Sequence, residues 1–594
     1  MMVIPSLLFI VLLATPVYLN EIDPATKIRL NLKEFIKTGV KTRNLTNAIK
    51  YLKTLSDVGY RHEQSCQTCK YVVDGVLQYR RSGVQKGDMI KLITELCMIF
   101  SGWNKAGCKG RANIEIDALL YMMDNRKNLT ADRVCGIYLQ HYGCTDPNYQ
   151  EWHVNIPERT STAFVQPESS NQPLKILHLT DIHFDPEYEP GSNAVCEDPL
   201  CCRGGTPDKP ENAAGYWGDY HVCDMPWHSV LDLMDQVKRQ HQQIDFVYYT
   251  GDIISHASWL TTKESNKNDI GKLFELFSQR FNSILVYPIL GNHEAHPSNY
   301  YSPENISEAV SSQWLYDYVA NDWSKWLPED TKSTIRSGGF YTALVRKGYR
   351  IIGVNSNICY TDNIWLFFDD VDPHGQLQWL ADTLAQAEEN GEVVHLLSHV
   401  PPGSLECWHP WGNEFTRIIN RFSHIIRAQF NGHTHTDEIR IFLNDKKDNA
   451  VNVAYNGASF TTFVGMNPNY RVYDMDSKSF EITDYEEWIF NLTDANQNQN
   501  TPPSWYKLYS FKDAYGLNST SNEDLFDWIQ RMRNDPKKKL MKQYFRFLNR
   551  DSEVNINKGC DNDCLDALLC FIVSLTYEDA IKCYKTGAST HLIF

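Results

Sequence analysis

The stretch KILHLTDIH (175–183) sets the pattern that decides the fold, because an apolar run ends there directly in a polar Asp-x-His. Helical stretches separate several further apolar runs that also end in polar clusters: FVYYT (246–250), ILVYPIL (284–290), VVHLLS (393–398) and IIRAQF (425–430). Buried strands that alternate with helices predict an α/β sandwich. Chemistry in such folds gathers where strands end in loops, so we expect the functional residues at these five strand ends.

The polar residues that follow these runs form a candidate metal site: Asp181, His183, Asp252, Asn292, His399, His433 and His435. Residues i and i+2 of an extended segment point the same way, so each Asp-x-His or His-x-His pair can present two ligands to one site. Oxygen and imidazole ligands without thiolates suit zinc, manganese or iron rather than calcium or magnesium. Seven ligands are too many for one tetrahedral ion and fit two ions that share a carboxylate.

The composition excludes several classes of protein. The chain has 594 residues, 42% of them hydrophobic, which is ample for a large core and excludes a disordered protein. It carries 57 Lys and Arg against 73 Asp and Glu, a net charge of −16, whereas a nucleic-acid binder needs a basic face. We therefore expect no nucleic-acid partner.

The first residues indicate the compartment. The mostly apolar run from Val3 to Ala14 is too short to cross a bilayer and is typical of a signal peptide, which we place at residues 1–20. Five glycosylation sequons agree with secretion, at Asn44, Asn128, Asn305, Asn491 and Asn518. An oxidising compartment favours disulfides among the sixteen cysteines, and no later apolar run is long enough to span a membrane.

Composition and periodicity divide the rest of the chain. After a polar lead-in (21–61), residues 62–146 combine six cysteines with four amphipathic stripes, which predicts four short helices tied by three disulfides. Six cysteines allow fifteen pairings, and the residues alone do not choose among them. A Pro-containing linker (147–173), the strand-rich region (174–490) and a helical region (491–594) follow.

The strand-end motifs also carry a family resemblance. The order of the blocks resembles the calcineurin-like metallophosphoesterases, and the text of GNHEAHP (291–297), SHVPPG (398–403) and FNGHTHTDE (430–438) resembles the acid sphingomyelinase family. That family has a saposin-like domain before its phosphoesterase domain, and the six-cysteine block resembles it. The resemblance runs from about Cys66 to Cys583 and implies a saposin-like domain at 62–146 and a metallophosphoesterase β-sandwich flanked by helices at 174–490.

The resemblance implies roles for single residues. Two zinc ions would be held, one by Asp181, His183 and His435, the other by Asn292, His399 and His433, with Asp252 as the bridge. His293 would give a proton to the leaving oxygen, and His256 would be a second active-site histidine outside the ligand set. The implied disulfides are Cys66–Cys144, Cys69–Cys135, Cys97–Cys108, Cys196–Cys201, Cys202–Cys223, Cys359–Cys407, Cys560–Cys564 and Cys570–Cys583.

The implied activity is hydrolysis of sphingomyelin to ceramide and phosphocholine by in-line attack of a metal-bound hydroxide. We expect an acidic pH optimum and a secreted or lysosomal monomer. Two alternatives stay open: a related zinc phosphodiesterase for nucleotides or other small phosphodiesters, and a lipid-binding protein with an inactive phosphoesterase domain. His293 and His256 also have plainer interpretations, as residues that only orient Asn292 or the substrate.

A membrane lipid substrate requires contact with the bilayer. We expect the saposin-like domain to make it through its amphipathic helices. A second candidate is the helix after Pro536, whose Lys539, Lys542, Arg546 and Arg550 are predicted to share one face. The plainer interpretation of that helix is one packed on the core with a solvated basic face.

Overall fold

The computed structural model describes residues 34–35, 62–159, 164, 172–444, 446–576, 579 and 583. The predicted signal peptide, the sequon at Asn44 and nearly all of the 21–61 lead-in lie outside these residues. In the part of the chain that the structure covers, no helix is both long and apolar enough to cross a membrane.

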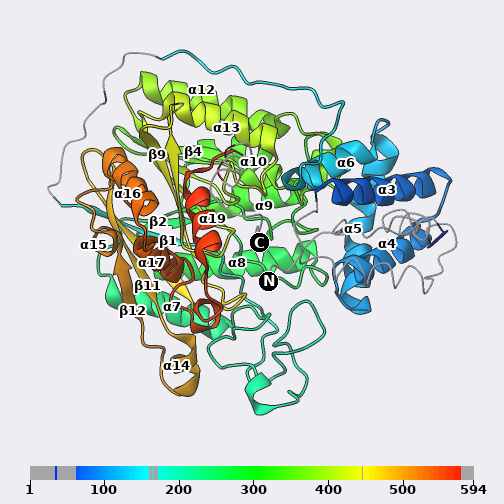
Figure 1. Cartoon of the computed structure of the whole chain (residues 1–594), viewed down its shortest axis with the longest axis horizontal. Helices are drawn as coiled ribbons and strands as arrows, with labels where there is room; N and C mark the ends of the chain where they lie inside the picture. The colour runs from blue at the N-terminus through cyan, green and yellow to red at the C-terminus, as the bar shows by residue number, and fades with distance from the viewer. Residues whose placement is uncertain are drawn as a thin grey trace.

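The N-terminal helices form a module at one end of the long axis of the molecule (Figure 1). They are α3 (His62–Arg81), α4 (Lys86–Phe100), α5 (Lys105–Asn125) and α6 (Ala131–Tyr138). The side chains of Asn104 and Thr130 accept backbone N–H bonds at the starts of α5 and α6, so polar N-caps set these boundaries. Three disulfides tie the helices together: Cys66–Cys144, Cys69–Cys135 and Cys97–Cys108.

The body is built on two six-stranded sheets. The first has the order β12-β11-β10-β1-β2-β3 and the second the order β4-β5-β6-β7-β9-β8. The strands of the first sheet are β1 (Leu174–Leu179), β2 (Phe246–Tyr249), β3 (Leu285–Pro288), β10 (Asn469–Met475), β11 (Ile482–Ile489) and β12 (Tyr506–Ser510). Those of the second are β4 (Tyr341–Arg346), β5 (Tyr349–Gly353), β6 (Val393–Leu397), β7 (Ile426–Asn431), β8 (Glu438–Leu443) and β9 (Ala450–Asn456).

The central strands run parallel and are buried along most of their length. β1 pairs with β2 and β2 with β3 in parallel, as do β5 with β6 and β6 with β7. Every residue of β2 and β6 is buried, which explains their unbroken apolar sequence. Because parallel strands end at the same edge of a sheet, this arrangement brings the polar strand ends together.

Polar side chains join the two sheets through the core. The Tyr248 hydroxyl on β2 lies 2.9 Å from Nδ1 of His395 on β6 and 2.5 Å from the hydroxyl of Tyr349 on β5. Nε2 of His395 lies 2.8 Å from a backbone carbonyl, and Nε2 of His178 lies 2.8 Å from the Thr250 hydroxyl. Both histidines are thus satisfied inside the core, and the predicted α/β sandwich flanked by helices is confirmed.

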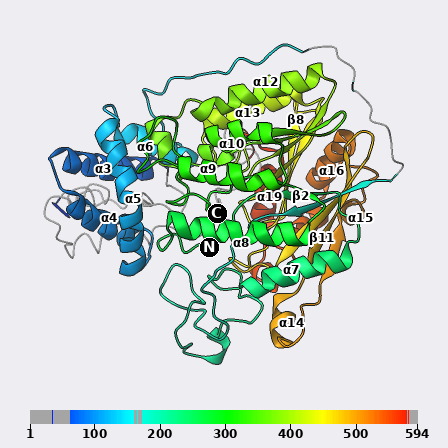
Figure 2. The same ribbon diagram turned by 180° about the vertical axis from the view of Figure 1, so that it is seen from behind.

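Helices cover the outside of the sandwich. Figure 2 shows α7, α8 and α9 on the near side of the molecule, and α12 and α13 lie together in both views. Their bounds are α7 (Trp227–Gln240), α8 (Lys263–Arg280), α9 (Gln313–Asp322), α10 (Lys332–Gly338), α11 (Trp365–Phe368), α12 (Gln376–Glu389) and α13 (His409–Phe422). Short 3-10 helices lie at Gln140–Tyr142, Pro210–Asn212, Trp323–Lys325, Glu329–Thr331, Ser356–Cys359 and Pro373–Gly375.

The C-terminal region belongs to the same body. Its strand β12 pairs with β11, so it contributes to a sheet as well as forming helices. The helices are α14 (Leu492–Gln497), α15 (Phe511–Tyr515), α16 (Asn522–Asn534), α17 (Lys539–Leu548), α18 (Glu553–Ile556) and α19 (Asn562–Val573). Five further disulfides are Cys196–Cys201, Cys202–Cys223, Cys359–Cys407, Cys560–Cys564 and Cys570–Cys583, the pairs that the resemblance implies.

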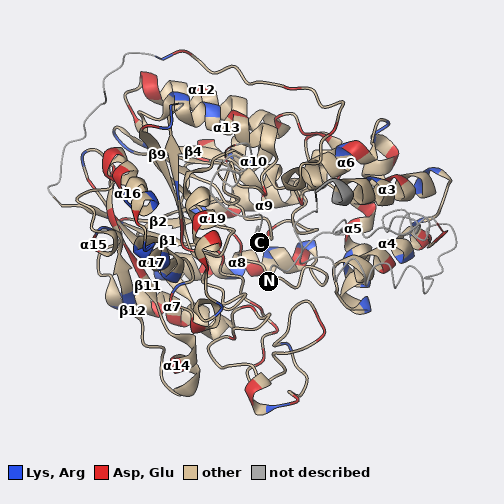
Figure 3. Cartoon of the chain, in the orientation of Figure 1, with Lys and Arg blue, Asp and Glu red and all other residues tan. Residues whose placement is uncertain are grey.

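The basic face expected on α17 is incomplete. Figure 3 shows basic residues gathered there, but Arg550 is fully buried and donates to the backbone carbonyl of Ser459. Nε and Nη2 of Arg546 each lie 2.6 Å from the carboxylate of Asp551. The prediction that Arg550 shares the exposed face is wrong, because the chain leaves the helix at Leu548 and turns inward. The structure matches the plainer interpretation, a core-packed helix with a solvated basic face.

The N-terminal module docks on the body through polar contacts. Nε of Arg133 lies 2.8 Å from the carbonyl of Phe367 in α11, and its Nη2 lies 2.6 Å from the carboxylate of Asp370. Nε2 of Gln140 donates to the carbonyls of Leu405 and Cys407 at 3.1 and 2.8 Å. These contacts fix how the module lies against the loop before α13.

Candidate metal centre

All seven predicted metal ligands come together at one edge of the sandwich. Asp181 and His183 follow β1, Asp252 follows β2 and Asn292 follows β3. His399 follows β6, and His433 and His435 follow β7. Six of the seven side chains belong to two clusters of possible metal-binding groups, and Asp252 is common to both.

The first cluster contains Asp181, His183, Asp252 and His435. Nε2 of His183 lies 3.2 Å from Oδ2 of Asp252 and 3.2 Å from Nε2 of His435. Nε2 of His435 lies 3.5 Å from Oδ1 of Asp181. Donor atoms about 2.1 Å from one tetrahedral ion lie about 3.4 Å apart, so these spacings fit a single ion.

The second cluster contains Asp252, His399 and His433, with Asn292 between the two histidines. Nε2 of His399 lies 3.3 Å from Oδ2 of Asp252 and 2.9 Å from Oδ1 of Asn292. Nδ1 of His433 lies 2.8 Å from the same oxygen of Asn292. One oxygen of Asp252 thus lies within ligand spacing of both clusters, as a bridging carboxylate requires.

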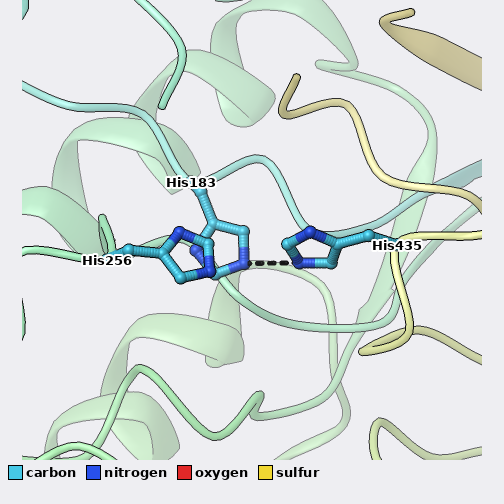
Figure 4. A group of neighbouring side chains, drawn as sticks. All are labelled: His183, His256 and His435. Carbon is cyan, nitrogen blue, oxygen red and sulfur yellow. Dashed lines mark hydrogen bonds between the residues drawn. The ribbon is translucent and has the colours of Figure 1, made fainter. Parts of the chain in front are cut away.

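Hydrogen bonds to backbone carbonyls orient the rings of three of the four histidines. Nδ1 of His183 lies 2.6 Å from the carbonyl of Ile254, and Nδ1 of His399 lies 2.6 Å from that of Thr250. Nδ1 of His435 lies 2.9 Å from the carbonyl of Phe463. A protonated Nδ1 leaves the Nε2 lone pair free for a metal, which is the usual arrangement around metal-bound imidazoles. Figure 4 shows the rings of His183 and His435 facing each other through their Nε2 atoms.

His433 is oriented differently, by a residue that sequence reasoning missed. Its Nδ1 faces Asn292, and its Nε2 lies 3.1 Å from Oε2 of Glu406. Glu406 follows the SHVPPG stretch and precedes Cys407, which the Cys359 disulfide anchors. A carboxylate on the far nitrogen fixes the ring and makes it a stronger ligand. A lone Glu in a loop gave no signal in the sequence.

The backbone of the ligand loops is strained. Five of the seven ligands have positive φ: Asp181 at 49°, His183 at 39°, Asp252 at 62°, His433 at 75° and His435 at 59°. Such angles are uncommon for residues other than glycine and cluster at functional sites. The expectation that Asp-x-His and His-x-His are extended pairs is therefore wrong, because the side chains converge through left-handed turns.

Two glycines permit close approach of the loops. A Cβ on Gly291 would lie 2.1 Å from Oδ1 of Asp252, and one on Gly432 would lie 2.2 Å from the Thr180 hydroxyl. Both distances are impossible for real atoms, so any side chain there would displace a ligand loop.

The two predicted active-site histidines lie beside the first cluster. The ring of His256 is 4.1 Å from that of His183, and the ring of His293 is 4.9 Å from it. Figure 4 shows His256 alongside His183. His256 could join His183 and His435 as a ligand on distance alone, but its Nδ1 is held 2.8 Å from the carboxylate of Asp224, and Phe463 stacks on its face at 3.9 Å.

Asp224 and Glu294 are further carboxylates of the site that received no role from the sequence. Asp224 lies directly after Cys223 and is fully buried. The buried carboxylate of Glu294 accepts backbone N–H bonds from Gly291, Asp252 and Ile253, and so ties the loop after β3 to the loop after β2.

Asp252, His183 and His399 hold each other in charged forms. Burial alone would lower the pKa of His183 and of His399, but Asp252 raises each to about 9. Burial likewise opposes ionisation of Asp252, yet His399, His293 and His183 hold its pKa well below the usual range. A metal ion that binds His183 and His399 must therefore displace their protons.

Comparison with known proteins identifies the class. The sequence model of the calcineurin-like phosphoesterase family matches residues 174–437, and that of the acid sphingomyelin phosphodiesterase C-terminal region matches residues 449–590. Fold and site together define a calcineurin-like metallophosphoesterase with a candidate two-metal centre.

Similar proteins narrow the class to a family. A sphingomyelin phosphodiesterase of Bos taurus is 32% identical over 529 residues, which cover 87% of this chain and 83% of the relative. Sphingomyelin phosphodiesterase 1 of Caenorhabditis elegans is 32% identical over 88% of this chain and 93% of its own. A cyclic GMP-AMP phosphodiesterase of Bos taurus is 30% identical over 70% of this chain and 91% of its own. The chain belongs to the acid sphingomyelin phosphodiesterase family.

We predict that Asp252→Asn removes metal from both clusters, because one oxygen of this carboxylate serves both. Elemental analysis should find about two ions per wild-type chain and close to none in the variant. Asp224→Asn is the matched control, since it changes a buried carboxylate of the same site whose hydrogen bonds go to His256 and Thr461 rather than to a predicted ligand. Full metal content in Asp252→Asn would contradict a bridging role.

Proposed function

We propose that this chain is a zinc-dependent phosphodiesterase that hydrolyses sphingomyelin to ceramide and phosphocholine. The observation that carries the proposal is the oxygen of Asp252 that lies 3.2 Å from His183 and 3.3 Å from His399, at the centre of seven oxygen and nitrogen donors. Two zinc ions held there neutralise the phosphodiester charge and lower the pKa of water enough to provide the nucleophile near neutral pH. Family membership supports the substrate class.

The donor set fits zinc. Four imidazoles, two carboxylates and one amide oxygen are borderline ligands of the kind that zinc takes in catalytic sites, and neither of the two clusters that share Asp252 contains a cysteine. Asp181, His183 and His435 would hold one ion, Asn292, His399 and His433 would hold the other, and Asp252 lies within reach of both groups.

His293 protonates the leaving oxygen in this proposal. The backbone N–H of His293 donates to Oδ1 of Asp252 at 2.8 Å, which places the His293 ring beside the proposed bridging carboxylate. Burial lowers the pKa of His293 well below the usual range, although Asp252 opposes this effect. An anionic phosphodiester beside the ring favours the imidazolium, so the substrate itself promotes the protonation that catalysis needs. A low working pH adds to this effect, which supports an acidic optimum.

His256 orients the reacting phosphate or the His293 ring. The two rings are 4.7 Å apart. Burial lowers the pKa of His256 to about 4 in spite of Asp224, so it is neutral over most of the pH range. Because Asp224 holds its Nδ1 and Phe463 stacks on its ring, His256 suits a fixed hydrogen-bond role better than the role of proton donor.

Lipid reaches the site from the N-terminal module in this proposal. An apolar pocket of about 750 Å³, its opening included, lies among α3, α4, α5 and α6. Its wall includes Val76, Leu119 and Met123 of the module and Phe367 of α11 in the body. An apolar pocket that reaches the domain boundary can shelter an acyl chain while the headgroup enters the metal centre.

The proposed function also agrees with a lysosomal or extracellular location. Eight disulfides involve all sixteen cysteines, which suits the lysosome or the extracellular space. Asn128, Asn305 and Asn518 are exposed, whereas Asn491 is half-buried and caps α14. The three exposed sequons are therefore the better acceptor sites.

Turnover tests the proposed function directly. The purified protein should hydrolyse sphingomyelin in liposomes, lose activity after chelation and regain it with zinc. Assays from pH 4 to 7.5 should show higher activity on the acidic side. A soluble nucleotide diester serves as the competing substrate, and turnover of the diester without sphingomyelin would establish the alternative function instead.

We predict that His293→Ala keeps its metal but loses about 10²–10⁴-fold in kcat on sphingomyelin, the usual contribution of an acid catalyst. A nitrophenyl phosphodiester, whose leaving group needs no proton, should lose much less. Metal content is measured on the same samples. Equal losses on both substrates would place His293 in substrate positioning rather than proton donation.

We predict that Met123→Gln impairs lipid access rather than chemistry, because this half-buried side chain lines the apolar pocket. Turnover of sphingomyelin in vesicles should fall several-fold, while turnover of a short-chain, water-soluble sphingomyelin should be retained. Met98→Gln is the matched control, since Met98 is a half-buried methionine of α4 outside the pocket lining. Parallel loss on both substrates would make the module a scaffold only.

A further inference from the structure

A second pocket, with a mixed polar and apolar lining, lies beside the metal centre at the boundary between the N-terminal module and the body. One wall is α5, which supplies Arg111 and Glu115. The opposite wall is the loop after β3, which supplies His293, Ser298 and Asn299. The pocket spans about 300 Å³, its opening included.

Three buried polar atoms point to a missing ligand. Within the described part of the chain, Nδ1 of His293, Oγ of Ser298 and Oε2 of Glu115 have no hydrogen-bond partner. Their residues are 9%, 6% and 3% exposed, and all three line this one pocket. A buried polar atom without a partner is costly, so three in one small pocket indicate a place for a polar ligand.

The wall formed by α5 is held rigidly. Nε of Arg111 donates to Oε1 of Glu115 at 2.6 Å, and the Arg111 guanidinium lies 5.5 Å from the centre of the Trp103 ring. The Tyr300 hydroxyl neighbours the same carboxylate. Because Arg111 balances the charge of Glu115, the pocket offers hydrogen bonds without a net charge, which suits a neutral polar group rather than a phosphate.

The opposite wall connects the pocket to the metal centre. Nδ2 of Asn292 donates to Oδ1 of Asn299 at 2.8 Å, which turns Oδ1 of Asn292 toward His399 and His433. His293 reaches both the pocket and the neighbourhood of Asp252. A group in the pocket therefore lies next to the residue that we assign to the leaving oxygen.

We propose that this pocket is a subsite for the polar part of the leaving alcohol, an amide and a hydroxyl close to the reacting oxygen. The inference rests on the proposed function, in which the leaving group is a ceramide. Oε2 of Glu115 accepts from the hydroxyl or the amide N–H, and the Ser298 hydroxyl donates to the amide carbonyl. The N-terminal module thereby completes the specificity of the active site, since Glu115 comes from α5.

The test compares substrates that share phosphocholine but differ in the leaving group. They are a short-chain, water-soluble sphingomyelin, its analogue without the 3-hydroxyl, and nitrophenyl phosphorylcholine. The variants are Ser298→Ala and the double variant Arg111→Met/Glu115→Leu, which removes both charges so that neither is left buried and unpaired. Ser192→Ala is the matched control, because Ser192 is also buried and its hydroxyl has no partner among the described residues, but it lies outside the pocket.

Each pocket variant should lower kcat/KM for the soluble sphingomyelin about 5–10-fold. The same variants should change kcat/KM for nitrophenyl phosphorylcholine by less than about twofold. The preference of the wild type for sphingomyelin over the deoxy analogue should shrink in the variants, and Ser192→Ala should match the wild type. Wild-type turnover of sphingomyelin tests the proposed function separately, so only the change in substrate ratio tests the subsite.

Two results would overturn the subsite. Parallel losses on all three substrates would assign the pocket to phosphocholine or to packing between the module and the body, and a lowered melting temperature would single out packing. Unchanged ratios in stable variants would leave the pocket without a role in recognising the leaving group.

Discussion

The buried carboxylate of Asp252 is the interaction on which the rest of the site depends. Its Oδ2 lies within 3.3 Å of histidines that come from opposite sheets, His183 after β1 and His399 after β6. Burying an anion is costly unless cations or metal ions surround it. The sandwich therefore has to bring its two sheets together at this edge, and the links from Tyr248 to His395 and Tyr349 secure that approach through the core.

This convergence requires strained backbone angles in the loops and glycine at two positions. Five ligands adopt left-handed angles, and Gly291 and Gly432 leave no room for a Cβ. The carbonyls that hold His183, His399 and His435 set each ring before any metal arrives. The donor atoms are therefore close to ligand spacing in the protein alone, which is the meaning of a preorganised site.

The sequence contained enough to predict the sandwich and the polar residues that gather at one edge of it, for physical reasons. Buried parallel strands such as KILHLT and VVHLLS have a distinct apolar pattern, and their ends must meet at one edge. It did not reveal Glu406 or Asp224, because single carboxylates in loops look alike until the fold brings them to His433 and His256. Helical periodicity also predicted that Arg550 lies on the basic face of its helix. The helix ends at Leu548, and Arg550 is buried.

The loop that carries Glu406 has a consequence for regulation. Gln140 of the N-terminal module donates to the carbonyls on both sides of Glu406, and Glu406 in turn holds His433. One short chain of hydrogen bonds thus connects the docked N-terminal module with the imidazole of His433, a predicted metal ligand. Because linkage is reciprocal, a ligand that binds more tightly when these hydrogen bonds are formed would also change the affinity of the His433 cluster for a metal ion.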